Sequence, residues 1–265
     1  MAGDPARVPG MILLLGGTSE TADLAEALAA ADLSVIVSTV TDLPLNTGAY
    51  PRIERVTGAL DAPSMERMVR NRGIKAIVDA THPYAAGAHE TARRVADKVG
   101  LPCFTWTREP TRYDAGAVDI ADDHEHAAEL AASHGRTVLL TTGSKNLSIY
   151  AESCRNSGVP LIARVLPEPE SIEACLAAGI EPDKIVTGRG PFSLEENVSL
   201  IRKFDIGVLV TKDSGPAGGA PEKLEAAERC GCRVIMIRRP VGEHDHGFSE
   251  VESLVRAVCA AVRTG

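Results

Sequence analysis

Four cationic side chains follow predicted β-strands at the point where each strand ends. They are Lys145, Arg164, Arg189 and Lys212. Parallel strands end at one edge of a sheet, where the loops carry binding groups. Ammonium and guanidinium groups gathered at that edge favour a ligand with several carboxylates, because charge-assisted hydrogen bonds reinforce one another. Each cation taken singly could also be an ordinary solvated surface residue, so the prediction depends on the set.

A glycine-rich turn follows the first apolar run, in the stretch MILLLGGTSE from Met11 to Glu20. The residues after it have apolar side chains at helical spacing, so the turn joins a strand to the beginning of a helix. Such a turn favours phosphate, because amide groups and the helix dipole point into it and glycine leaves the backbone accessible. We therefore predict a dinucleotide or a related adenosine cofactor here. The spacing is not G-x-G-x-x-G, so a plain tight turn is the alternative.

A histidine and a tyrosine, His82 and Tyr84, follow another predicted strand in the segment DATHPYA. Histidine titrates near neutral pH and is a common general acid or base, and Tyr84 could act similarly. The alternative for His82 is a supporting role in which it only donates or accepts hydrogen bonds.

Other common catalytic motifs are absent from the sequence. Two H-x-H pairs lack a nearby third ligand, so we expect surface histidines and no metal site. These pairs are His124 with His126 and His244 with His246. A G-x-S-x-G elbow and a Walker lysine are also missing, which leaves redox or group-transfer chemistry.

The elements that position these residues alternate along the whole chain of 265 residues, strand-like run after helical pattern. This alternation predicts an α/β protein with mainly parallel sheets. A stretch rich in turn residues and charge, 107–119, favours a linker between two domains. We predict a loose segment at 1–10, a cofactor domain at 11–112 and a substrate domain at 113–265, with a ligand cleft lined from both domains.

The composition favours a protein that binds small molecules. The formal net charge is −8 with acids and bases interspersed, which argues against nucleic acid and anionic membranes as partners. No apolar run is long enough for a bilayer span and the first ten residues lack a secretory signal, so we expect a cytoplasmic protein. The six scattered cysteines lack zinc-site spacing and indicate reduced thiols.

Seven segments occur in the order typical of the precorrin-6A reductase family of cobalamin biosynthesis, which the chain resembles over about residues 11–240. They are LLLGGTSET, VDATHPYA, TTGSKN, RVLPEPES, TGRGPFS, TKDSG with AGGAPEKLEAA, and VIMIRRP. The resemblance implies two Rossmann-like domains with the active site between them. It also implies nicotinamide-dependent reduction of a ring double bond of precorrin-6A, or of its cobalt form, to the 6B product. The segments RVTGALD and TKDSGPAGGAPEK look closer to the branch of the family that acts on cobalt-containing intermediates. The acid-rich macrocycle agrees with the cations described above.

The resemblance also implies roles for individual residues. The cofactor would lie against Gly16, Gly17, Thr18, Ser19 and Glu20. The reacting carbons would be bordered by Thr81, His82, Pro83 and Tyr84, of which Thr81 also contacts the cofactor. The substrate would face Gly143, Ser144, Lys145, Lys212, Asp213 and Ser214, together with Arg164 and Arg189 from the strand ends. The proton donor stays open, because solvent or a substrate carboxyl is as suitable as His82 or Tyr84.

The end of the second predicted strand, VIVSTVTDLPLN, bears on the choice of nicotinamide. In dinucleotide folds an acid there binds the adenosine ribose, whereas a nearby arginine binds the extra phosphate of NADPH. Asp42 therefore favours NADH over NADPH. In the alternative, Ser38 and Thr39 bind the cofactor as part of a phosphate pocket, which Arg52 and Arg55 reach only if the intervening loop folds back.

Two other classes of function stay open. A methyltransferase that uses S-adenosylmethionine and acts on a tetrapyrrole would also place an adenosine at the first loop, but it leaves the loops of the second domain unexplained. A non-catalytic dinucleotide sensor would need the first domain alone.

Overall fold

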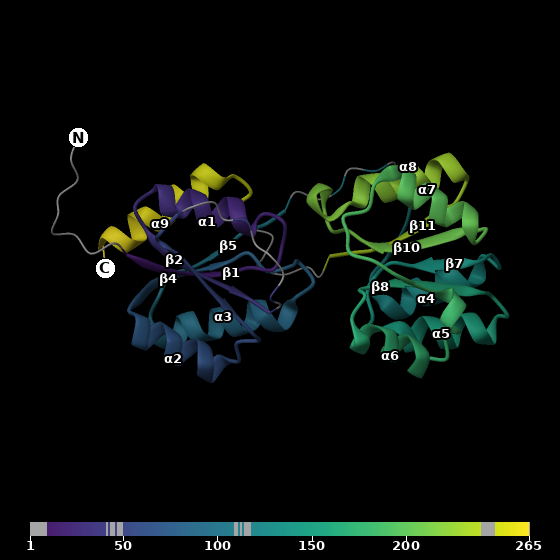
Figure 1. Ribbon diagram of the computed structural model, residues 1–265, viewed down its shortest axis with the longest axis horizontal. Helices are drawn as coiled ribbons and strands as arrows, with labels where there is room; N and C mark the ends of the chain where they lie inside the picture. The colour runs from purple at the N-terminus through teal and green to yellow at the C-terminus, as the bar shows by residue number, and fades with distance from the viewer. Residues whose placement is uncertain are drawn as a thin grey trace. The chain divides into compact units, whose positions relative to one another are not determined.

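The chain folds into two compact units, Met1–Arg108 with Pro240–Gly265, and Glu109–Arg239. Each unit contains one parallel sheet with helices on both faces (Figure 1). This arrangement confirms the predicted α/β class. The computed structural model describes residues 10–264, except 41, 43–45, 47–49, 109–110, 112, 114–117 and 240–246.

The first unit contains a five-stranded sheet in the order β3-β2-β1-β4-β5, in which every neighbouring pair is parallel. The strands are β1 (Met11–Leu15), β2 (Ser34–Thr39), β3 (Ile53–Thr57), β4 (Ile74–Asp79) and β5 (Cys103–Thr105). The chain runs outward from β1 through β2 and β3, then crosses to β4 on the other side of β1. Open α/β sheets bind ligands at such a reversal, beyond the carboxyl ends of the strands.

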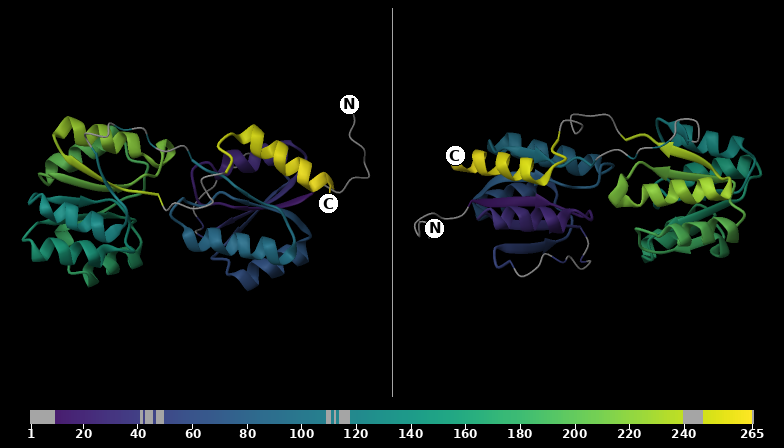
Figure 2. Two further views of the ribbon diagram at one scale, coloured as in Figure 1. Left: turned by 180° about the vertical axis from the view of Figure 1, so that it is seen from behind. Right: turned by 90° about the horizontal axis from the view of Figure 1, so that it is seen from above.

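Helices α1 (Thr21–Ala30) and α9 (Val251–Thr264) cover one face of this sheet, and α2 (Ala62–Arg72) and α3 (Ala86–Val99) cover the other (Figures 1 and 2). Alternate side chains of β1 serve the two faces. Ile12 and Leu14 pack into the core formed with α1 and α9. Leu13 and Leu15 pack into the core formed with α2 and α3. The strand has no solvated face, which explains its unbroken apolar run.

Helix α9 belongs to the first unit although it comes last in the chain. Leu254 and Val258 are fully buried in one cluster with Leu24 and Leu28 of α1. The prediction that 113–265 form a single domain is therefore wrong for the last segment. The physical reason is that α9 buries its apolar side chains against α1 and β4 of the first unit.

The first boundary between the units and the beginning of the chain can be compared with the sequence-based expectations. The first crossing comes after Arg108, inside the predicted linker and slightly before the predicted boundary of 112/113. The segment predicted to be loose lies outside the described residues except for Gly10, whose carbonyl accepts a hydrogen bond of 3.0 Å from the amide of Ser34.

The second unit contains a six-stranded parallel sheet in the order β6-β11-β10-β7-β8-β9. The strands are β6 (Val118–Ala121), β7 (Val138–Leu140), β8 (Leu161–Val165), β9 (Ile185–Thr187), β10 (Val208–Lys212) and β11 (Arg233–Ile237). From β7 the chain runs outward through β8 and β9 and then returns to β10 on the other side. The reversal therefore lies between β7 and β10.

Helices α7 (Leu194–Lys203) and α8 (Ala220–Cys230) cover one face of the second sheet (Figure 1). The other face is covered by α4 (His124–Ser133), α5 (Leu147–Asn156) and α6 (Pro169–Ala177). Short 3-10 turns, η1 (Pro182–Lys184) and η2 (Pro216–Gly218), precede β9 and α8. Leu139 and Leu209 pack against Ile201 and Ala226 in the core beneath α7 and α8.

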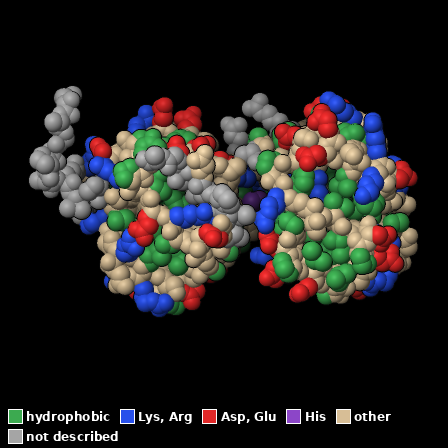
Figure 3. Space-filling view, viewed as in Figure 1, with side chains coloured by type: hydrophobic (Ala, Val, Ile, Leu, Met, Phe, Trp, Pro, Cys, Tyr) green, Lys and Arg blue, Asp and Glu red, His purple; other side chains and the backbone are tan. Residues whose placement is uncertain are grey.

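The surface agrees with the interspersed charge of the sequence. On the face shown in Figure 3, acidic and basic side chains alternate over the described residues of both units. Among the described helices, none is both long enough and apolar enough to cross a bilayer. All six cysteines are free thiols.

Candidate functional site

Two glycines follow the last residue of β1, at the reversal of the first sheet. A Cβ on Gly16 would lie 2.3 Å from Cγ2 of Thr21, so only glycine fits there. Gly17 has a φ of +119° and no atom within 4 Å of the position that a Cβ would occupy. The exposed backbone at Gly17 is therefore open to a ligand, as a phosphate-binding turn requires.

Hydroxyl groups fix the shape of this turn. Oγ1 of Thr21, a fully buried residue, accepts hydrogen bonds of 3.1 Å from the amides of Gly17 and Thr18. The hydroxyl of Thr18 donates to the carbonyl of Ala80, at 3.2 Å, and so joins the loops that follow β1 and β4. A bound phosphate would compete with Thr21 for these two amides. Sequence reasoning missed Thr21, whose signal is a hydroxyl at the first position of the helix.

Glu20 stands at the N-terminus of α1 and forms an ion pair with Arg108. The hydroxyl of Ser19 donates a 2.8 Å hydrogen bond to the same carboxylate. Burial alone would raise the pKa of Glu20, but the hydrogen bond and charge of Arg108 outweigh it and hold the pKa below its ordinary value. The carboxylate of Glu20 is thus engaged within the protein, and Arg108, which the sequence did not single out, brings positive charge to this helix end.

The end of β2 carries two buried hydroxyl residues and an arginine. Ser38 and Thr39 are 7% and 5% exposed. Arg55 of β3 donates from Nε and Nη2 to Oγ1 of Thr39, at 3.2 and 2.9 Å. Arg55 lies in β3 opposite Val37 of the parallel strand β2, and this pairing brings its guanidinium to Thr39. Arg52 instead pairs with Asp32, at 2.8 Å.

A buried carboxylate holds the loop that follows β4. Asp79 accepts from the amide and hydroxyl of Thr81, at 3.1 and 2.7 Å. Its other oxygen lies 2.6 Å from Nδ1 of His89 on α3, and both residues are at most 3% exposed. Burial would raise the pKa of Asp79, but the bonds with His89 and Thr81 hold it below the ordinary value. Thr81 therefore directs its hydroxyl to Asp79. Sequence reasoning missed His89, because no neighbouring residue in the sequence marks it as a partner of Asp79.

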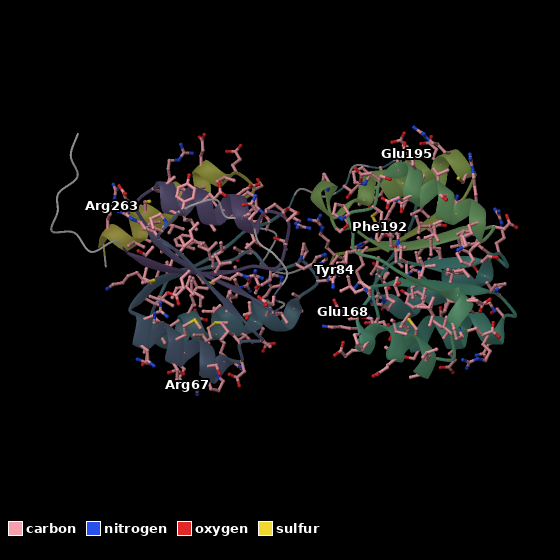
Figure 4. All side chains as sticks on the ribbon, in the orientation of Figure 1. Arg67, Tyr84, Glu168, Phe192, Glu195 and Arg263 are labelled. Carbon is pink, nitrogen blue, oxygen red and sulfur yellow. The ribbon has the colours of Figure 1, made fainter. Side chains whose placement is uncertain are left out.

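His82 and Tyr84 lie together in this loop, and Tyr84 is labelled in Figure 4. Their ring centroids are 5.6 Å apart. The amide of Tyr84 donates to Nδ1 of His82, at 3.3 Å. In neutral His82 the proton is then on Nε2, which leaves this nitrogen as the hydrogen-bond donor of the ring. Both side chains are partly exposed.

In the second unit, the loops after β7 and β10 meet at the reversal of the sheet. Gly143, with a φ of +89°, begins the segment that carries Ser144 and Lys145. The hydroxyl of Ser144 lies 3.4 Å from that of Ser171. Burial, followed by the charge of Lys145, lowers the pKa of Lys212. Two ammonium groups from different strand ends therefore act on each other.

His124 is half-buried and lies within reach of the charge of Lys212, although the sequence suggested a surface histidine. Its Nδ1 lies 2.8 Å from the hydroxyl of Tyr150, whose residue is fully buried. Burial and then the charge of Lys212 lower the pKa of His124. His126 is exposed. His244 and His246 lie outside the described residues, among which no group of three potential metal ligands occurs.

Asp213 and Ser214 are buried and make hydrogen bonds within the second unit. Oδ1 of Asp213 accepts from the amide and hydroxyl of Thr111, at 3.0 and 2.8 Å. Arg239 approaches the other carboxylate oxygen at 3.2 Å. The hydroxyl of Ser214 donates to the carbonyl of Gly218, at 3.1 Å. Both residues therefore hold the β10–α8 loop and the ends of the unit.

Arg164 and Arg189 differ in setting. Arg164 is 7% exposed, donates to Oδ1 of Asn197 at 2.9 Å, and places its guanidinium 4.1 Å from the ring centroid of Phe192. Burial lowers its pKa to about 10. Arg189 forms a 2.5 Å ion pair with Glu168 at the surface. Figure 4 labels Phe192 and Glu168.

A family model described as precorrin-6x reductase CbiJ/CobK matches residues 11–259. The chain belongs to this family. Membership makes it an oxidoreductase of cobalamin biosynthesis, a precorrin-6A reductase by family, and implies a nicotinamide cofactor.

Relatives of both names in this family are similar to the chain. A cobalt-precorrin-6A reductase from Priestia megaterium is 34% identical over 255 residues, 96% of this chain and 100% of the relative. A precorrin-6A reductase from Rhodococcus erythropolis is 34% identical over 238 residues, 86% and 89% of the two chains. A solved structure titled CobK precorrin-6A reductase shares the fold, with a TM-score of 0.76, 23% identity and coverage of 95% and 97%.

The predicted residues of the first unit differ in their surroundings. The backbone at Gly17 is open and the side chains of His82 and Tyr84 are partly exposed, whereas Glu20 pairs with Arg108 and Thr81 bonds to Asp79. In the second unit cationic groups face the reversal of the sheet.

Proposed function

We propose that the first unit binds the nicotinamide cofactor and that the second binds the carboxylates of the precorrin macrocycle. The observation that carries this division is the clear space at Gly17, next to the N-terminus of α1, set against Lys145, which follows β7, and Lys212, which ends β10, at the reversal of the second sheet. A pyrophosphate needs exposed backbone at a helix N-terminus, and Arg108 adds positive charge there. A macrocycle with several acid side chains needs cations.

When bound, the cofactor supplies a hydride to one carbon of the ring double bond, and the neighbouring carbon takes a proton. The residues of the first unit then have two tasks, to hold the nicotinamide against the ring and to keep that proton source in place. We assign the proton to Nε2 of His82 in its charged imidazolium form, which becomes a neutral ring when the proton is transferred, because the amide of Tyr84 occupies the Nδ1 side of the ring. Tyr84 packs against the imidazole and orients it.

His82→Gln is expected to lower kcat about 100-fold, within the range for general acid catalysis, with little change in KM. Tyr84→Phe keeps the ring and should retain most of the activity. If the His82→Gln enzyme keeps the wild-type kcat, solvent or a substrate carboxyl supplies the proton instead.

Two opposing groups set the choice of nicotinamide. Arg55 lies beside Thr39 at the end of β2, where the extra phosphate of NADPH would come, and Asp42 follows as an exposed acid that favours NADH. We expect Arg55→Ala to lower kcat/KM with NADPH by about 10-fold to 100-fold and with NADH by less than about threefold. Asp42→Ala should shift the ratio toward NADPH. Equal effects of Arg55→Ala on both cofactors would place the ribose elsewhere.

The experiment that tests the function compares reduction of precorrin-6A and of its cobalt form, without oxygen, with either nicotinamide as donor. Thermal unfolding with NADH, NADPH or S-adenosylmethionine added separates the reductase from the methyltransferase alternative, because a ligand that binds the folded state raises Tm, and turnover of the macrocycle separates the reductase from a non-catalytic sensor. Stabilisation by S-adenosylmethionine alone would exclude the reductase.

A further inference from the structure

A cavity of about 170 Å³ lies in the second unit, beyond the carboxyl ends of β7, β8 and β9. Thr141 and Gly143 line it from the loop after β7, and Arg164 lines it from β8. Phe192 comes from the loop after β9, and Lys223 comes from α8. Strand β8, the loops after β7 and β9, and helix α8 therefore line one space, and two of its lining groups are cations.

Arg164 is held firmly in the wall of this cavity. Its guanidinium stacks on Phe192 and donates to Oδ1 of Asn197. Asn197 is itself 3% exposed, and its amide group donates to the carbonyls of Phe192 and Ser193, at 3.2 and 2.8 Å. These bonds fix Oδ1 toward Arg164. A guanidinium has five N–H donors, so a single neutral acceptor leaves most of them for another ligand.

Lys223 brings a second positive charge to the same cavity. Burial and then the charge of Arg164 lower the pKa of Lys223 to about 8, and Glu222 opposes this shift. Within the described residues, neither Arg164 nor Lys223 makes a hydrogen bond with a carboxylate, and the charge of Glu196 is the one that raises the pKa of Arg164. A buried and a half-buried cation that repel each other are costly unless an anion joins them.

We propose that this cavity binds one carboxylate side arm of the tetrapyrrole, held between Arg164 and Lys223. The proposal rests on the proposed function for the identity of the arm. The volume admits an acetate or propionate group but not the ring, so the cavity would fix the macrocycle by one edge. Arg164 offers two parallel N–H groups, the geometry that a carboxylate prefers, and Lys223 offers a point charge.

Lys223→Gln is the central variant, with Lys223→Arg as the conservative rescue and Lys184→Gln as the matched control. Lys184 lies in the same unit, in a surface pair with Glu181. We expect Lys223→Gln to raise the KM for precorrin-6A about 10-fold to 100-fold, with kcat and the nicotinamide KM unchanged. Lys223→Arg should recover most of the affinity, and Lys184→Gln should match wild type.

Stability separates a binding role from a structural one. Because Lys223 and Arg164 repel each other in the absence of ligand, Lys223→Gln should unfold at the wild-type Tm or above it. A fall in Tm, a substrate KM within twofold of wild type, or a rise in the nicotinamide KM would each overturn the proposal.

A measurement without turnover keeps this test separate from the reductase assignment. Propionate should raise the Tm of the wild-type protein more than sodium chloride at the same ionic strength, and this difference should vanish in Lys223→Gln. If wild type fails to reduce precorrin-6A but propionate still acts through Lys223, the reaction is wrong and the carboxylate cavity stands. If propionate has no specific effect on wild type, the cavity proposal fails.

Discussion

Replacement of Asp79 by Asn should destabilise the first unit although the two side chains have the same size. The Asp79 carboxylate accepts three hydrogen bonds, two from Thr81 and one from His89. A hydrogen bond to a charged group contributes about 1.5 to 3 kcal/mol and a neutral one about 0.5 to 1.5 kcal/mol. The loss of charge should therefore cost about 1 kcal/mol for each bond, or about 3 kcal/mol in all.

The assay is urea unfolding followed by a signal from the first unit, with Asp32→Asn as the control. Asp32 also pairs with a basic side chain, that of Arg52, but the Asp32 side chain is 88% exposed. Loss of this pair should therefore cost less than about 0.5 kcal/mol. Asn also tolerates the φ of +64° at this position. Equal unfolding midpoints for the two variants would refute the argument.

The pH dependence gives an independent check with a definite sign. The pKa of Asp79 is held below its ordinary value in the folded protein, so its contribution to stability is present above the pKa of the unfolded chain. It is lost as the pH falls through the lower, folded pKa. The difference between wild type and Asp79→Asn should therefore be constant near neutral pH and shrink below about pH 4. A difference that grows in acid would contradict this linkage.

The remaining predictions concern the second unit. Lys145→Ala or Lys212→Ala should each raise the substrate KM by an amount corresponding to about 1.5 to 3 kcal/mol, less so in high salt, with the nicotinamide KM unchanged. A change in nicotinamide affinity instead would reverse the assignment of the two units. Replacement of Cys230 and Cys232 together by Ala should leave turnover intact, because burial raises the pKa of the Cys232 thiol to about 12 and keeps it unreactive. Loss of rate without unfolding would show that a thiol takes part.

Local pattern was enough to predict the parallel sheets. The apolar run of β1 predicted a strand covered on both faces, and Leu13 and Leu14 do face opposite cores. The alternation of strands and helices predicted the parallel sheets. The turn-rich stretch that contains Arg108 predicted where the chain first passes from one unit to the other. These features depend on neighbours in the sequence, which is why they could be predicted.

From the sequence, the site could be predicted only as a set of residues that follow strands. The sequence shows which charges are present, but it does not show which are already paired within the fold. Glu20 and Asp213 were expected to contact ligands, yet Arg108 and Thr111 engage them. Conversely, Lys223 lies on a helix, away from any strand end, and its place in a cavity follows only from the packing of α8.

The return of α9 to the first unit affects the order in which the protein can fold during synthesis. When a ribosome has completed Arg239, every strand of both sheets has been made, and the second unit has its whole chain. The first unit still lacks Leu254 and Val258, so the side chains of Leu24 and Leu28 are not yet covered by α9. We therefore expect the second unit to become resistant to protease first on the nascent chain, while the first unit completes its core only once α9 has emerged from the ribosome.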